Sequence, residues 1–289
     1  MSPRCVSLLF LCALASVRAV RPWERWRPAP LAAAAAADDW AAVPLPAGPR
    51  MALNATQWKG AFRTTGRAYN ASLAVFDARA FTVALPPSGC TQHAATSTTA
   101  KLAHCAYATN GGFFDFPPHA ACEGNLILNN VLTQYLSPDR TNVAVNATHA
   151  LVGYSTSATV GASAASSLVS GLGWLVRDGA SYVKSAREYS SSSFFTEWAP
   201  RTGAGWRADG AGLLLTVDGI EGTSKTAGAD LFEFADLLIE LGAVAAMNLD
   251  GGGSTTAVLR GAVYNQPHCA DTWAVCERLV TSTTCVLDA

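Results

Sequence analysis

Cysteines that follow an N-terminal apolar segment most constrain the fold of this 289-residue chain. Arg4, an apolar run over positions 6–17 and small residues up to Ala19 are typical of a secretory signal peptide at residues 1–19. Two of the eight cysteines lie in this segment, which leaves six at positions 90, 105, 122, 269, 276 and 285. Because the secretory lumen is oxidising, we expect three disulfides in a protein that is secreted or stays in a Golgi-like lumen. Six cysteines allow fifteen pairings, and their spacing alone selects none.

The composition is that of a globular protein with little net charge. Hydrophobic residues make up 50% of the chain and charged residues 14%, which suits one folded core and not a disordered chain. Loss of the signal peptide would remove two arginines, so 20 basic residues become 18 against 21 acidic ones, a net charge of about −3. This charge favours no nucleic-acid partner. No later run reaches the roughly 18 apolar residues of a membrane span, so we expect no membrane anchor in this chain, and its oligomeric state stays open.

The residue pattern of the sequence changes near residue 53. Residues 20–52 lack a period that would bury one face, and we interpret them as a linker or pro-segment. Over residues 53–289, short β-rich runs separated by Gly, Asn and Asp predict an α+β domain with a mixed, mainly antiparallel sheet core, two or three helices and a cleft at strand ends. Asp-Gly and Arg-Gly turns predict hairpins over 173–184 and 257–264. Apolar spacing after Asp230 predicts a helix to residue 241, and a second helix is expected over 91–103.

Other local signals concern modification and metals. Sequons begin at Asn54, Asn70 and Asn146, which predicts N-glycosylation where these residues are exposed. The five histidines lack metal-ligand spacing, so we expect no zinc and no other cofactor. A divalent cation held by Asp218 and Asp250 stays open as an alternative, because hard cations need only oxygen ligands.

The most informative motif covers residues 244–256. A buried strand is predicted to end at Asp250, so the Asp250 carboxylate would lie at the C-terminal end of that strand. Three glycines, 251 to 253, follow, and their N–H groups can form a nest for an anion such as phosphate. Ser254 and Thr255 add hydroxyl groups. The alternative is a plain glycine-rich turn between two strands.

Three weaker motifs accompany it. Asn110, Gly111 and Gly112 precede two phenylalanines, which suits sugar binding, although a turn before two core aromatic residues explains the same pattern. Arg201 and Thr202 offer a planar guanidinium for phosphate, although a lone arginine is more often a surface residue. Asp218 follows an apolar strand over 213–217, as the end of an ordinary strand also would.

Together these segments resemble the phosphodiester glycosidase family from about Cys90 to Cys285. The similar motifs are Asn110-Gly-Gly-Phe-Phe, Cys122-Glu-Gly-Asn, Trp174-Leu-Val-Arg, Arg201-Thr and Asn248-Leu-Asp-Gly-Gly-Gly-Ser. The resemblance implies that Asn110, Arg201, Asp218 and Asp250 line one cleft. It also implies the disulfides Cys90–Cys122, Cys105–Cys285 and Cys269–Cys276. No role is transferred to Asp115, Glu123 or Glu221, where this sequence departs from the family pattern.

The resemblance further implies a hydrolase that cleaves the glycosidic C–O bond of a sugar-1-phosphodiester. The expected substrate is N-acetylglucosamine-phospho-mannose on glycoproteins. This substrate would connect the protein to mannose 6-phosphate and lysosomal targeting. Because a phosphomonoester leaves as an anion, the reaction needs charge stabilisation and a carboxylate near the anomeric carbon more than a strong acid. We expect Asp250 and Asp218 to be catalytic. The expected substrate-binding residues are Asn110, Gly111, Gly112, Arg201, Thr202, Gly251, Gly252, Gly253, Ser254 and Thr255. The alternatives are a carbohydrate-binding domain without turnover and a phosphodiesterase that cuts P–O.

Overall fold

The computed structural model describes residues 38–161, 163–190, 193–220, 227–269 and 274–288. The expected signal peptide, residues 20–37 of the expected linker or pro-segment, and Glu221 lie outside the described residues. The remainder of that segment begins with a strand, β1 (Asp39–Pro44), which pairs with β9 (His149–Tyr154). Its Val43 is 5% exposed, so this strand contributes to the core although the surrounding sequence shows no clear period.

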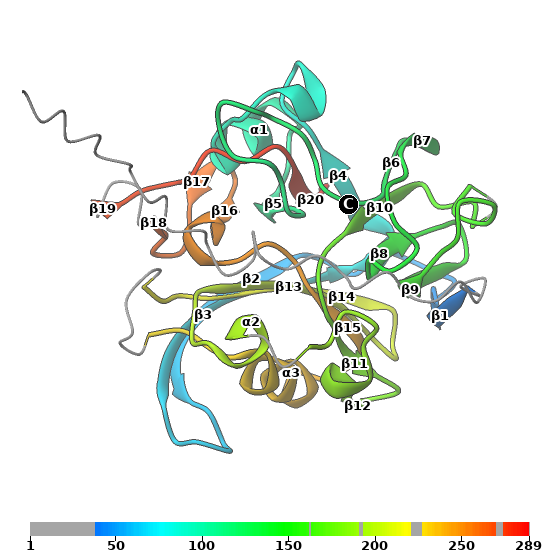
Figure 1. Ribbon diagram of the computed structural model, residues 1–289. Coiled ribbons are helices and arrows are strands. Elements are labelled where there is room, and N and C mark those ends of the chain that lie inside the picture. Colours follow the sequence, from blue (N-terminus) through cyan, green and yellow to red (C-terminus); the bar gives the residue numbers. More distant parts are fainter. Residues whose placement is uncertain (1–37, 162, 191–192, 221–226, 270–273, 289) are drawn as a thin grey trace, which may run out of the picture.

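A seven-stranded antiparallel sheet forms the central layer (Figure 1). Helices α2 (Ser193–Thr196) and α3 (Leu231–Glu240) lie on one of its faces, and the six-stranded and five-stranded sheets lie across the other, with α1 (Thr96–Leu102) outermost (Figure 1). Every strand pairing among the described residues is antiparallel, which confirms a mainly antiparallel core. The candidate site lies at strand ends of the seven-stranded and five-stranded sheets.

The elements have the following bounds. In sheet order, the seven-stranded sheet contains β12 (Ala180–Ser181), β11 (Trp174–Arg177), β15 (Ala243–Asn248), β13 (Arg201–Arg207), β14 (Ala211–Val217), β3 (Ala68–Asp77) and β2 (Asn54–Ala61). The six-stranded sheet contains β1, β9, β8 (Asn142–Val145), β10 (Ser167–Ser170), β6 (Leu126–Leu128) and β7 (Val131–Gln134). The five-stranded sheet contains β17 (Ala262–Val263), β16 (Ala257–Leu259), β5 (Tyr107–Asn110), β20 (Thr283–Val286) and β4 (Phe81–Ala84). A small pair joins β18 (His268–Cys269) and β19 (Ala274–Val275), and the α-helices are α1 (Thr96–Leu102), α2 (Ser193–Thr196) and α3 (Leu231–Glu240).

Strand β14 shows why the central sheet is covered on both faces. Successive side chains of a strand point to opposite faces. Leu213 and Leu215 pack in the core beneath α3, whereas Leu214 packs in the core shared with the other sheets. The apolar run in the sequence therefore reflects burial on two faces.

Helix α3 confirms the helix predicted after Asp230. The Asp230 side chain accepts the N–H groups of Phe232 and Glu233, and the Glu233 side chain accepts the Asp230 N–H, which completes a capping box. Gly242, with φ +89°, follows the helix end. The other predicted helix is shorter than expected, because Ala94 forms a β-bridge with Val280 and α1 begins only at Thr96.

Both predicted hairpins and all three implied disulfides are present. Asp178 and Gly179 have φ of 52° and 73°, and Arg260 and Gly261 have 48° and 80°, which are the positive values of tight hairpin turns. The bridges are Cys90–Cys122, Cys105–Cys285 and Cys269–Cys276. Helices of the length and apolarity needed to cross a bilayer do not occur in the described part of the chain.

Candidate functional site

Asn110, at the end of β5, joins three segments beneath the site. Its Nδ2 donates to the Asp250 carbonyl oxygen at 2.6 Å, and its Oδ1 accepts from the Thr202 hydroxyl at 2.8 Å and the Thr256 N–H at 3.2 Å. Its exposure is 0%, and its amide is engaged by protein groups. Asn110 therefore positions the Asp250 loop, and its contact with a sugar stays a prediction.

Asp250 lies just beyond β15, as the sequence predicts. Its N–H donates to the Gly111 carbonyl oxygen at 3.1 Å, and its Oδ1 accepts the Gly251 N–H at 2.9 Å. Asp250 is 9% exposed, so the carboxylate is held by the surrounding backbone and is largely enclosed.

The glycine loop after Asp250 differs from the predicted anion nest. The Gly251 N–H is used by Asp250, and the Gly252 N–H donates to the Pro200 carbonyl oxygen at 2.8 Å. A Cβ on Gly251 would lie 2.7 Å from that same Pro200 oxygen, and Gly252 has φ +58°. Glycine is thus required here for close packing, and two of the three expected N–H donors are not available to a phosphate.

The neighbouring polar residues also point inward. Ser254, Thr255 and Thr202 are each at most 1% exposed, and the Thr202 hydroxyl lies 3.4 Å from that of Thr255. Gly111 and Gly112 are buried against Ser282, which accepts the Gly111 N–H through its carbonyl oxygen and the Gly112 N–H through its hydroxyl. These residues support the Asp250 loop, and substrate contact by any of them stays a prediction.

Arg201 is turned away from the expected phosphate position. Strand alternation places Thr202 toward Asn110 but Arg201 on the face covered by the helices. The guanidinium donates to three carbonyl oxygens, those of Ala229 (3.0 Å), Phe194 (3.0 Å) and Glu197 (2.8 Å). Burial lowers the pKa of Arg201 to about 10, so the side chain remains a cation at neutral pH. Arg201 is thus a buried cation that holds α2 and the segment at Ala229, and its Cδ lies 3.7 Å from where a Cβ on Gly251 would stand. Phosphate binding by Arg201 stays a prediction.

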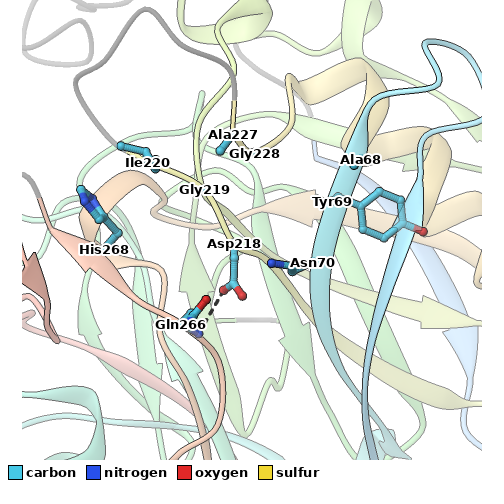
Figure 2. Close-up of a pocket in the computed structure, with 10 residues that line it drawn as sticks. All are labelled: Ala68, Tyr69, Asn70, Asp218, Gly219, Ile220, Ala227, Gly228, Gln266 and His268. Carbon is cyan, nitrogen blue, oxygen red and sulfur yellow. Dashed lines mark hydrogen bonds between the residues drawn. The ribbon is translucent and has the colours of Figure 1, made fainter.

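Asp218 lines an open pocket of about 420 Å³ (Figure 2). It follows β14, and its N–H donates to the Asn70 carbonyl oxygen at 2.9 Å. Its Oδ1 accepts the Asn265 Nδ2 at 2.9 Å and the Gln266 N–H at 3.3 Å. The pocket is lined by Ala68, Tyr69, Asn70, Asp218, Gly219, Ile220, Ala227, Gly228, Gln266 and His268.

The environment of Asp218 alters its acidity. Burial raises the pKa of the carboxyl group, and the hydrogen bonds from Asn265 and Gln266 oppose that increase. Among the described residues, Oδ2 accepts no hydrogen bond. A carboxylate of this kind can face a ligand and exchange a proton with it.

Asn265 connects the two expected catalytic aspartates. Besides Asp218, its Nδ2 donates to the Thr255 carbonyl oxygen at 3.1 Å, and its Oδ1 accepts the Ala257 N–H at 2.7 Å. Asp250 lies at the start of that same loop but is not among the residues that line the pocket. The structure therefore joins Asp218 and the Asp250 loop through one amide. Of the four residues expected to line one cleft, Asp218 lines this pocket, and Asn110, Arg201 and Asp250 do not.

Several pocket residues were missed from the sequence. In the sequence, Asn70 is marked only by its sequon, and the segment from Asn265 to His268 matches none of the motifs above. The signal available was a polar run directly after a predicted hairpin and before Cys269. For metals, no group of three or more His, Cys, Asp or Glu side chains suited to an ion occurs within the described ranges.

Comparison with known proteins places the chain in a family. A family model described as phosphodiester glycosidase matches residues 103–287, more than half of the chain. The chain belongs to the phosphodiester glycosidase family. The match covers the strand ends that carry Asn110, Asp218 and Asp250.

Two mammalian relatives illustrate the similarity. N-acetylglucosamine-1-phosphodiester alpha-N-acetylglucosaminidase of Homo sapiens is 31% identical over 261 residues, which are 78% of this chain and 47% of the relative. The Mus musculus enzyme of that name is 30% identical over 244 residues, 72% of this chain and 43% of the relative. The chain thus spans about half the length of these curated relatives.

Two solved structures share the fold. The zebrafish N-acetylglucosamine-1-phosphodiester alpha-N-acetylglucosaminidase catalytic domain, described as auto-inhibited by its pro-peptide, has a TM-score of 0.75 at 24% identity, covering 87% of this chain and 88% of that one. A hypothetical protein from Synechocystis has a TM-score of 0.66 at 16% identity, covering 84% and 64%. The α+β fold predicted from the sequence is thereby confirmed.

Proposed function

We propose that this phosphodiester glycosidase hydrolyses the glycosidic C–O bond of an N-acetylglucosamine-1-phosphodiester, with N-acetylglucosamine-phospho-mannose on glycoproteins as its substrate. The activity for which the mammalian relatives are named supports this substrate class. The observation that carries the proposal is the Asp218 carboxyl group, which lines an open pocket and has one oxygen without a protein hydrogen bond among the described residues.

The proposed chemistry follows from that placement. The leaving phosphomonoester departs as an anion, so the remaining requirement is a carboxylate near the anomeric carbon. Asp218 would stabilise positive charge on the sugar and activate water or attack directly, with Asp250 as its partner. The Asp250 loop is held to Asp218 by Asn265, which supports a joint role for the two aspartates.

We also propose that the protein acts in a Golgi-like lumen of the secretory pathway or outside the cell. Three disulfides support this location, because such bridges persist in oxidising compartments. Its partners there would be glycans or glycoproteins that carry a sugar phosphodiester.

Asp218→Asn tests the proposal directly. The substitution retains the size of the side chain and removes its charge, so kcat/KM for an N-acetylglucosamine-1-phosphodiester should fall by about 10²–10⁴-fold. Asp250→Asn should also abolish most activity, whereas Asp209→Asn, on an exposed turn, is the matched control. Wild-type turnover by Asp218→Asn would refute the assignment.

Hydrolysis in ¹⁸O-labelled water separates the proposed reaction from its alternatives. Label in the released sugar indicates C–O cleavage, and label in the phosphate indicates a phosphodiesterase that cuts P–O. Tight binding without any product would indicate a carbohydrate-binding domain instead.

A further inference from the structure

If the proposed function holds, the pocket that contains Asp218 must also bind the negatively charged phosphodiester, which requires a hydrogen-bond donor. A phosphodiester is an anion, and an ionised Asp218 would repel it unless another group compensates. Arg201 does not supply that group, because its buried guanidinium is bound to three carbonyl oxygens and Arg201 is not among the residues that line the pocket. A hydrogen-bond donor to the phosphoryl oxygens, which would offset part of this repulsion, must therefore come from elsewhere in the pocket wall.

His268 is the one residue with a basic side chain among the ten described residues that line the pocket. Figure 2 shows it on the far side of Asp218 from Tyr69 and Asn70. The part of the chain that the structure describes supplies no hydrogen-bond partner to the His268 ring, and its Nδ1 is buried. The ring is therefore not engaged in holding the fold through hydrogen bonds.

The unpartnered Nδ1 determines which ring nitrogen can donate. A buried N–H without an acceptor is unfavourable, so the neutral ring carries its proton on Nε2. Nε2–H is then a hydrogen-bond donor with no acceptor among the described protein groups.

The backbone at His268 is held by strand pairing, packing and a disulfide. β18 pairs with β19 and packs against η5 (Gly252–Ser254), the short helix that follows Asp250. The disulfide Cys269–Cys276 closes this unit, and the Cys276 N–H donates to the Pro267 carbonyl oxygen at 3.2 Å. A side chain on such a support can hold a ligand group in a defined place.

We propose that His268 binds the phosphoryl group of the substrate, with the sugar directed toward Asp218. This inference rests on the proposed function and adds to it the orientation of the substrate in the pocket. His268 is thereby a specificity residue for phosphate and not a residue for the sugar.

Binding of two small probes tests this orientation without turnover. We expect His268→Leu to weaken binding of the phosphomonoester mannose 6-phosphate by at least about tenfold, because a charge-assisted hydrogen bond is lost. Binding of N-acetylglucosamine, a neutral sugar, should be unchanged. Equal loss for both probes, or for neither, would overturn the proposal. Titration calorimetry supplies both affinities.

Two further variants keep the test interpretable. His268→Gln places an amide donor close to the position of Nε2 and should restore part of the affinity for the phosphomonoester. If His268→Leu fails to fold, the proposal is judged on His268→Gln, which should bind the phosphomonoester more weakly than wild type but the sugar equally. His149→Leu, on the distant strand β9, is the matched control and should leave both affinities unchanged.

Kinetics distinguish failure of this inference from failure of the proposed function. If wild type hydrolyses the phosphodiester, His268→Leu should raise KM by at least about tenfold. An unchanged KM would overturn the role of His268 and leave the function intact. If wild type hydrolyses nothing, the proposed function fails, and the two binding constants still decide whether His268 selects phosphate.

Discussion

Asn265 is the residue from which the acidity of Asp218 can be altered without touching the carboxyl group. Its hydrogen bond lowers a pKa that burial raises, so Asn265→Ala should raise the pKa of Asp218 further. The protonated form then persists to higher pH. If the ionised form is active, the acidic limb of the kcat/KM profile moves to higher pH.

The matched control for this prediction is Gln266→Ala. Gln266 contributes to Asp218 through its backbone N–H, which the substitution retains, so the acidic limb should move little. Profiles of kcat/KM against pH for the three proteins give the answer. A limb that stays fixed or moves to lower pH in Asn265→Ala would contradict the assigned role.

Asn70 presents a conflict between modification and access to the pocket. It begins a sequon, yet it lines the pocket and its side chain points toward Asp218 in Figure 2. A glycan on Asn70 would fill the space proposed for substrate. We therefore predict that catalytically active protein carries no glycan at Asn70. Mass spectrometry of the Asn70 peptide, compared with the exposed sequon at Asn54, measures the occupancy, and full occupancy in active protein would contradict the prediction.

At the scale of elements, the sequence predicted what short-range signals determine. The capping box of α3 and the Asp-Gly hairpin are set by a few adjacent residues, and both occur where expected. Arg201 and Thr202 were expected to act together, but neighbouring residues on a strand face opposite sides of the sheet. Which side faced the site depended on the packing of α2 and α3, which a short motif does not contain.

The position of Arg201 gives a prediction about β13. Arg201→Met would leave the three carbonyl oxygens without their donor, so the free energy of unfolding should fall by about 2–4 kcal/mol. Arg207→Met, at the more exposed end of the same strand, is the control and should cost less than about 1 kcal/mol. Urea unfolding measures both. Loss of phosphate binding with full stability would instead support the original prediction for Arg201.

At the scale of the molecule, the site depends on contacts that the sequence does not display. Asp218, which follows β14, meets Asn70 on β3, and the 265–268 segment, which leads into β18, closes the pocket. Partners so distant along the chain are selected by packing of whole sheets, which periodicity in one strand cannot indicate. The sequence therefore indicated Asp218 and Asp250, but not the pocket wall opposite them.

The disulfides should differ in how strongly they stabilise this assembly. Cys105–Cys285 joins residues 180 apart, whereas Cys269–Cys276 spans only 7. In the chain-entropy model, closing the longer loop stabilises by about 5 kcal/mol and closing the shorter one by about 2 kcal/mol. Replacing each pair with serine should therefore lower the midpoint of unfolding much more for the first pair. If the short bridge proved the more stabilising, the entropic account would fail.

The Cys269–Cys276 bridge also supports His268, so its removal should weaken binding of mannose 6-phosphate at modest cost in stability. If its loss left binding of this phosphomonoester intact, the disulfide would not be what holds His268 in place.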